Sequence, residues 1–288
     1  MKRLTLLWIC TTALSLIGKE PALAPAEKRA YHLFSATPRE LMREMSTDRP
    51  DVTESPHTVD AGHFQIETDL ASYTYDRHNP ERVDVRVEGW SFLNLNLKAG
   101  LWHDTDLQLI LPVVNGQRIT DFEAGGVQRD RGFGDVTVRL KRNLWGNDGG
   151  ATALALMPFV KFPTASGELG NGAVEGGLIV PLGVDLSGGW TMGVMAEFYI
   201  NRDESGRDYH VEFLNSITFS RKLVGELGAY VEFVSLANTE SGSDWIVTGN
   251  GGFTYAVSED LQLDAGVNIG LTRAADDVNP FIGVSWRF

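Results

Sequence analysis

The chain has 288 residues, a hydrophobic fraction of 43% and a formal charge of −13. The hydrophobic content excludes a disordered protein. The acidic balance argues against nucleic acid as a partner, because phosphate contacts need clustered Lys and Arg. The length suits one large domain, as all-β barrels often have.

The N-terminus, residues 1–26, has the pattern of a secretory signal peptide. A basic start is followed by an apolar stretch over 4–18, too short to span a bilayer, and by small residues up to Ala26. We expect cleavage before Glu27; the alternative is a buried N-terminal helix. The only cysteine, Cys10, lies inside this segment, so the exported chain would contain no disulfide.

The next segment, residues 27–61, does not alternate and forms a leader. "SATPRELMREM" at 35–45 predicts a short helix capped by Thr37, and a stretch rich in turn-forming residues follows. Two interpretations stay open at this point. The leader is a solvated periplasmic segment, or it folds back into a lumen and narrows it, with Arg49 pairing with lumen charges.

From residue 62 onward apolar and polar residues alternate with a period of two, which predicts β-strands. The run over 83–98 keeps its alternation for about fifteen residues, whereas an ordinary strand has about five or six. About twelve runs are present: 63–75, 83–98, 107–113, 136–141, 154–162, 178–186, 192–200, 209–219, 227–233, 245–255, 261–271 and 279–288.

Three features distinguish a membrane barrel from a soluble sandwich, which also alternates. The strands are long, tight turns and longer loops follow each other in turn, and aromatic residues such as Trp190 and Trp245 fall at two levels. The sequence therefore predicts an all-β fold: a closed antiparallel transmembrane β-barrel of about 12 strands over 62–288, with a short helical or irregular N-terminal leader. The last strand should pair with the first, since a sheet in hydrocarbon must close on itself.

The polar residues of each alternating run should point inward, so the alternation predicts which side chains line the lumen. Trp90 should also point inward, and the loop over 114–133 should be the longest connection. The inward charges carry both signs, so they form either a solute path or a satisfied network that fills the barrel. They are Glu67, Asp69, Arg86, Glu88, Lys98, Arg139, Lys141, Lys161, Glu197, Glu212, Glu232, Asp264 and Arg287.

A catalytic or metal site is not expected from the spacing of the reactive residues. An outer-membrane lipid hydrolase needs a nucleophile beside a base. His210 is the one histidine in a strand interior, and Ser216 lies roughly 20 Å along an extended strand at ~3.3 Å per residue, so the two cannot touch. No sequence motif holds a metal or a cofactor, and we expect neither.

The chain closes on "NPFIGVSWRF", with apolar residues alternating up to Phe288. Trp286 and Phe288 should face lipid at the seam of the barrel. A terminal aromatic residue is similar to the signal that the barrel-assembly machinery reads, so we expect these two residues to act in assembly.

The stretch "STDRPDVTESPHTVDAGHFQIETDL", with "GFGDVTVRLKRNLWG" and the terminal Phe, resembles a family of outer-membrane proteins or transporters named for a meta-pathway of phenol degradation. The resemblance covers nearly the whole exported chain. It implies an outer-membrane β-barrel connected with passage of aromatic or other hydrophobic small molecules. It supplies no functional residues, and the family name does not imply phenol degradation by the protein itself.

These observations predict a non-enzymatic channel in the outer membrane of a Gram-negative-type bacterium. It would be a monomer, and its partners would be outer-membrane lipid, the assembly machinery and a small solute that passes passively, aromatic and hydrophobic molecules among the candidates. The alternatives are a lipid-acting outer-membrane enzyme, and a structural or surface-binding barrel that makes contact through the 114–133 loop.

Overall fold

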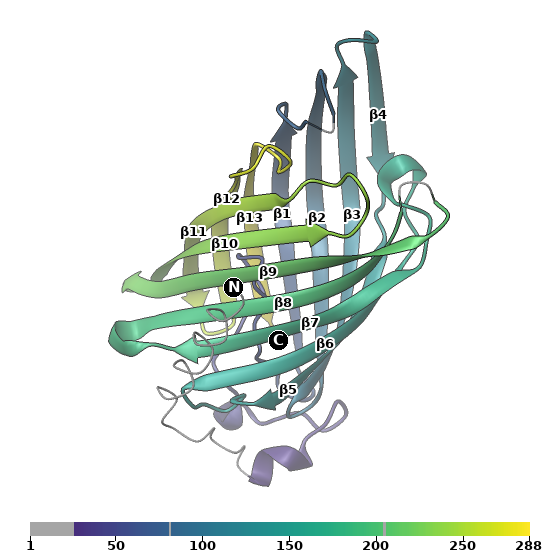
Figure 1. Ribbon diagram of the computed structural model, residues 1–288. Helices are drawn as coiled ribbons and strands as arrows, with labels where there is room; N and C mark the ends of the chain where they lie inside the picture. The colour runs from purple at the N-terminus through teal and green to yellow at the C-terminus, as the bar shows by residue number, and fades with distance from the viewer. Residues whose placement is uncertain (1–25, 81, 204–205) are drawn as a thin grey trace, which may run out of the picture.

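The computed structural model describes residues 26–80, 82–203 and 206–288. The predicted signal peptide, residues 1–26, lies outside them except for its last residue. The alternating runs form strands, which confirms the all-β prediction (Figure 1). They are β1 (Phe64–Asp76), β2 (Val85–Trp102), β3 (Thr105–Asp121), β4 (Gly126–Gly132), β5 (Val136–Trp145), β6 (Thr152–Phe162), β7 (Glu175–Asp185), β8 (Trp190–Arg202), β9 (Tyr209–Val224), β10 (Leu227–Asn238), β11 (Ile246–Ser258), β12 (Leu261–Gly270) and β13 (Val278–Arg287).

The sheet is antiparallel and closes on itself. β13 pairs with β1, with Arg287 opposite Gln65, and the main-chain groups of Phe64 and Phe288 exchange hydrogen bonds of 3.0 and 2.9 Å. Pairing of β2 with β3 completes the ring. Closure satisfies the backbone polar groups without water, as hydrocarbon surroundings require. The predicted pairing of the last strand with the first is therefore confirmed.

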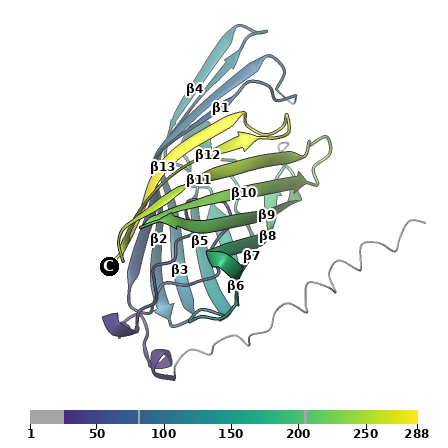
Figure 2. The same cartoon turned by 90° about the vertical axis from the view of Figure 1, so that its left-hand side faces the viewer.

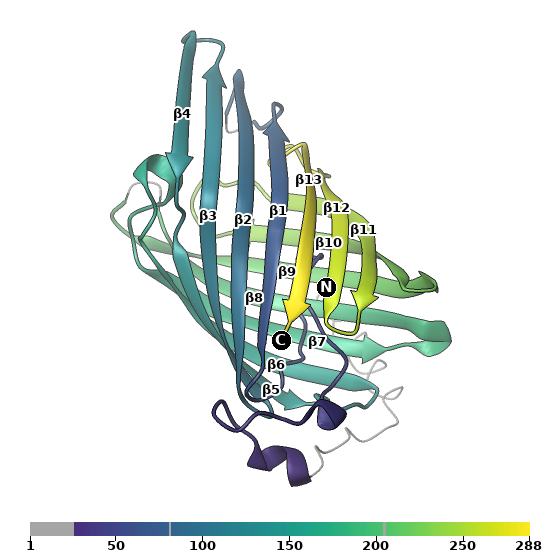
Figure 3. The same cartoon turned by 180° about the vertical axis from the view of Figure 1, so that it is seen from behind.

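The barrel has twelve strand positions although thirteen strands are described, because β4 and β5 share one position. Both pair with β3: β4 with its outer part and β5 with Thr105–Ile110. The prediction of a loop over 114–133 is therefore wrong. This segment is a hairpin of β3 and β4 that, with β2, rises above the rest of the barrel (Figures 1 and 3). The Asp121 carboxylate accepts hydrogen bonds from the amides of Glu123 and Ala124 and forms its turn.

The two ends of the barrel differ in the length of their connections. The end that holds the C-terminus and the leader has short connections, such as 186–189 and 225–226 (Figure 2). The opposite end carries the longer ones, such as 163–174. This difference matches the predicted alternation and the known pattern of outer-membrane barrels, whose short turns are periplasmic.

The two faces of the strands have opposite character. Apolar side chains on the outer face are exposed, such as Val231 at 59% and Phe253 at 56%, whereas the neighbouring inner residue Glu232 is 6% exposed. An apolar exterior with a polar interior is the pattern that a lipid environment favours.

The leader contains only two short 3-10 turns, η2 (Ala26–Ala30) and η3 (Arg39–Leu41), which lie beside the short-turn end (Figure 1). The predicted helix over 35–45 is therefore wrong. η3 has no side-chain cap, so Thr37 does not act as one. The backbone amide of Thr37 instead donates to the carbonyl of Ala61 at 2.9 Å, and this tertiary contact holds the chain extended. No helix among the described residues is long and apolar enough to cross a membrane.

Candidate functional site

The inner part of the leader, residues 43–61, lies inside the barrel, and Asp48 is its central anchor. The Asp48 carboxylate lies 2.5 Å from both Lys98 Nζ on β2 and Lys141 Nζ on β5, and all three side chains are at most 5% exposed. Burial alone would raise the pKa of Asp48, but the two ammonium groups outweigh it and lower the pKa well below its usual range. Asp48 thus stays ionised and joins two strands.

Arg49, the next residue, joins the two sides of the barrel seam. Its guanidinium contacts Asp264 on β12 through two nitrogens, at 2.6 and 3.2 Å, and Asp69 on β1 at 2.5 Å. It also lies 5.6 Å from the ring centre of Phe281. A planar guanidinium suits such a two-sided arrangement because its donors point in fixed directions.

The following leader residues contact β10 and, again, β5. The Glu232 carboxylate on β10 accepts hydrogen bonds from the amides of Val52 and Thr53, and from the Thr53 hydroxyl. Glu54 forms an ion pair with Arg139 on β5. The leader therefore meets charged partners on strands that are far apart in the sequence.

Towards the short-turn end the leader packs closely against β2. Arg43 pairs with Asp60 at 3.0 Å, and the amide of Val59 donates to Asp106 on β3. A Cβ atom on Gly100 would lie 2.0 Å from the Asp60 carbonyl oxygen. Only glycine therefore permits this approach of the leader to the wall.

Eight of the thirteen predicted lumen residues contact the leader. They are Glu67, Asp69, Lys98, Arg139, Lys141, Glu232, Asp264 and Arg287. Lys161, Glu197 and Glu212 lie on the inner face nearer the long-loop end. Lys161 pairs with Glu175, and Glu212 accepts a hydrogen bond from Asn238. Glu197 lies two residues after Met195 and therefore on the same face of β8.

Arg86 and Glu88 are exceptions, and their predicted lumen position is wrong. β1 has a bulge between Asp69 and Ala71, and β2 has a positive φ of 58° at Leu93, so the inward parity changes along both strands. Above these points Ser91 faces inward, bonded to Ser72 at 2.7 Å. Arg86, Glu88 and Trp90 consequently share the outer face with Tyr73, whose hydroxyl contacts Glu88.

An apolar cluster on the inner wall was not predicted. Met157, Phe159, Ile179 and Met195 from β6, β7 and β8 are buried and pack together, with Tyr199 and Leu214 against them. The sequence signal was present in the alternation, since Met157 and Phe159 share the inward parity of Lys161. Charges alone do not mark the whole inner face, because this part of it is apolar.

Cavities remain in the interior of the barrel. One, of about 1010 Å³, lies between leader residues such as Arg49 and Pro56 and the wall of β7–β12. The wall there carries small side chains: Gly183, Thr191, Gly193, Thr218, Ser220, Gly228 and Thr254. The second, of about 650 Å³, lies towards the long loops and is bordered by Ser72, Asn94 and Lys161. Asp69 lies between the two cavities, because its carboxylate contacts Arg49, which borders the first cavity, and Asn94, which borders the second.

The residues weighed for lipid hydrolysis do not form a nucleophile–base pair. Ser216 is bonded to the hydroxyl of Thr53 at 2.7 Å, whereas His210 contacts Asp203, Glu212 and Glu240. The two side chains thus have different partners, as their spacing predicted. Trp286 and Phe288 lie on the outer face of the seam, with ring centres 4.9 Å apart.

Comparison with known proteins gives the family. Residues 47–288 match the family described as "Putative MetA-pathway of phenol degradation". No curated protein sequence matches the chain. The match includes Asp48, Arg49 and the whole barrel, and the chain belongs to this family, as the resemblance predicted.

Solved structures with the same fold are outer-membrane barrels. The COG4313 outer membrane channel from Pseudomonas putida F1 is 14% identical, with a TM-score of 0.61 over 84% of this chain and all of that one. The transport unit of the autotransporter AIDA-I from Escherichia coli is 12% identical, with a TM-score of 0.51 over 85% and 93%. The NanC porin is 11% identical, with a TM-score of 0.50 over 77% and 98%. At these identities the likeness concerns the fold.

Proposed function

We propose that this member of the phenol-degradation family is an outer-membrane channel that lets small solutes pass passively beside its docked leader. The observation that carries the proposal is the cavity of about 1010 Å³ between the leader and the wall of β7–β12. A barrel filled only for structural reasons would pack its interior to the density of a protein core.

The uneven distribution of charge supports a path on one side. The leader is fixed by ion pairs to β2 and β5, through Lys98, Lys141 and Arg139. The wall of β8–β11 offers many small hydroxyl and glycine positions, with charged side chains such as Arg221, Lys222 and Glu226 at its short-turn end. The small side chains leave open space along this wall, so the route favours small molecules.

The inner apolar cluster supports hydrophobic or aromatic solutes. Met157, Phe159, Ile179 and Met195 give apolar contact area inside the barrel, with Tyr199 beside them. Binding sites for small molecules combine such area with a few polar groups. The family description names phenol degradation, which agrees with a small aromatic solute.

Single-channel recording in planar bilayers tests the proposal. The full exported chain should give discrete openings, and phenol in the bath should lower their conductance through occupancy of the interior. Removal of residues 27–61 should raise the conductance several-fold if the leader narrows the lumen. A folded barrel that is silent with and without the leader would contradict a channel.

We also propose that Trp286 and Phe288 act in assembly. Phe288 stacks on Phe64 with ring centres 6.0 Å apart, directly at the seam. Phe288→Ala should reduce the heat-modifiable barrel in the membrane fraction, because the substitution removes the aromatic contacts of Phe288 with Phe64 and Trp286 at the seam. An unchanged amount of inserted barrel would contradict this role.

A further inference from the structure

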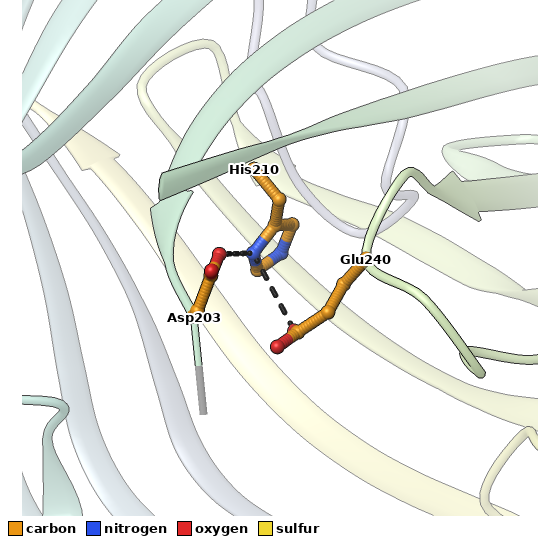
Figure 4. A group of neighbouring side chains, drawn as sticks. All are labelled: Asp203, His210 and Glu240. Carbon is orange, nitrogen blue, oxygen red and sulfur yellow. Dashed lines mark hydrogen bonds and ion pairs between the residues drawn. The ribbon is translucent and has the colours of Figure 1, made fainter. Parts of the chain in front are cut away.

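The rim of the barrel at the long-loop end carries a histidine surrounded by carboxylates from three places in the chain. His210 near the start of β9 faces Asp203 after β8 and Glu240 after β10 (Figure 4). It also faces Glu212 on its own strand. The His210 side chain is 9% exposed, and those of Asp203 and Glu240 are 21% and 23% exposed. The channel proposed above does not use this group.

The two ring nitrogens have different surroundings. Nε2 lies 3.3 Å from the Glu212 carboxylate, which Asn238 also holds at 3.1 Å. Nδ1 faces two carboxylate oxygens, Asp203 Oδ1 at 2.9 Å and Glu240 Oε2 at 3.5 Å. A carboxylate on one ring nitrogen is the arrangement that fixes the tautomer of a metal-binding histidine and leaves the other nitrogen to the metal.

Two carboxylates from different connections converge on one ring nitrogen. Asp203 Oδ1 and Glu240 Oε2 both approach Nδ1, whereas Nε2 faces Glu212 on the other side of the ring. A divalent cation beside Nδ1 would be attracted by both carboxylates and by the lone pair of a neutral imidazole.

The spacing of the candidate ligand atoms fits such an ion. The atoms offered by Asp203, His210 and Glu240 all lie within 4.8 Å of one another. Two bonds of roughly 2.1 Å at a tetrahedral angle put neighbouring ligand atoms about 3.4 Å apart. The distances from Nδ1 of 2.9 and 3.5 Å fall on either side of this value.

The backbone supports the two carboxylates independently of each other. The amide of Asp203 donates to the carbonyl of Asp208 at 3.0 Å, which fixes Asp203 next to the start of β9. The amide of Glu240 donates to the side chain of Asn238 at 2.7 Å. Since Asn238 also holds Glu212, one residue positions both a ligand and the partner of Nε2.

We propose that Asp203, His210 and Glu240 form a binding site for a first-row divalent transition metal ion, with Glu212 as the positioning residue for the His210 ring. Imidazole with two carboxylates suits Zn²⁺ and its neighbours rather than Ca²⁺ or Mg²⁺, which take oxygen ligands. The bound ion would join the connection between β8 and β9 to the one between β10 and β11 at the outer mouth of the barrel.

Titration with Zn²⁺ tests this site. The full exported chain, purified without a polyhistidine tag and treated with a chelator, should bind one equivalent in calorimetry. His210→Ala should weaken the affinity at least a hundredfold, and Asp203→Asn or Glu240→Gln at least tenfold. Glu212→Gln should weaken it about 10- to 100-fold, as loss of a histidine's outer carboxylate does.

His78→Ala is the matched control, because His78 at the same end of the barrel faces a single carboxylate, Asp277, at 2.9 Å. It should bind Zn²⁺ like the parent. His210→Arg keeps a positive charge among the carboxylates but offers no ligand, so it should fold as a heat-modifiable barrel and bind no ion. Absence of stoichiometric binding in the parent, or parental affinity in His210→Ala or His210→Arg, would overturn the proposal.

Discussion

The two sides of the barrel interior are built differently, although both belong to one alternating sheet. On the side of β2, β3 and β5 the wall carries buried charges such as Lys98, Asp106 and Lys141, and the leader packs directly against them. On the side of β8–β11 the wall carries glycine, serine and threonine, and a cavity of about 1010 Å³ remains. The difference teaches that buried ion pairs hold the leader directly against one side, whereas on the other side it bonds to separate points such as Glu232 and open space remains between them.

Asp48→Asn should change the charged side most. The substitution leaves the Lys98 and Lys141 ammonium groups buried with one negative partner fewer, and breaking a buried pair typically costs about 3–5 kcal/mol. The leader should leave the lumen, so it becomes sensitive to protease in the folded barrel and the conductance rises.

The control for Asp48→Asn is Glu259→Gln. Glu259 is 86% exposed and pairs with Arg39 of the same leader at 3.0 Å. Exposed ion pairs contribute little. Equal protease sensitivity of the two variants would show that the buried charges do not hold the leader.

A larger side chain should have different effects on stability and conductance at a packed position of the wall and at one that borders the cavity. Ala155 on β6 is fully buried, and Ala155→Phe should destabilise the barrel by about 1–3 kcal/mol through overpacking. Ser220→Phe projects into the open cavity, so it should cost about 0.5 kcal/mol or less and lower the conductance instead. Thermal unfolding and single-channel currents measure both effects; equal destabilisation by the two substitutions would remove the distinction between the sides.

Gly100→Ala should separate the leader from the wall without any change of charge. Its new Cβ would meet the backbone of Asp60 at 2.0 Å, and we expect a cost of about 1–2 kcal/mol to docking. Gly89→Ala on the same strand is the matched control, because the nearest atom to its Cβ is the Thr74 side chain at 3.4 Å. Protease sensitivity of the leader should rise only in Gly100→Ala.

The pH should modulate docking on the open side. Burial and the neighbouring Glu232 carboxylate raise the pKa of the leader residue Asp51 to about 8. In the docked leader Asp51 keeps its proton up to about pH 8, whereas in the undocked leader it loses the proton near pH 4. The free energy of docking therefore becomes less favourable as the pH rises from about 4 to 8, and it changes little above pH 8.

Between pH 7 and 9 the docked state should lose about tenfold in population relative to the undocked state, or ~1.4 kcal/mol. Conductance against pH, compared with Asp51→Asn, measures it. The variant carries no proton to release and should lack this pH dependence. A parental profile in Asp51→Asn would assign the effect to another group.

The alternation of residues was sufficient to predict the closed barrel, its seam and its apolar exterior. A period of two extends over most of the chain, and a sheet in hydrocarbon has no alternative to closure. The lumen charges were found in the same way, except where bulges near Asp69 and Leu93 reversed the parity and placed Arg86 and Glu88 outside. Bulges leave no reliable mark in the residue types, because they depend on how two strands pair.

Tertiary structure alone decided the contents of the lumen and the rim. The residues of the leader do not indicate that Asp48 meets Lys98 and Lys141, since these partners are about 50 and 93 positions away. The group of Asp203, His210 and Glu240 has no sequence motif, because the pairing of β9 with β8 and β10 sets their connections side by side. Local periodicity fixes which face a side chain takes; the register of paired strands fixes which distant side chains it meets.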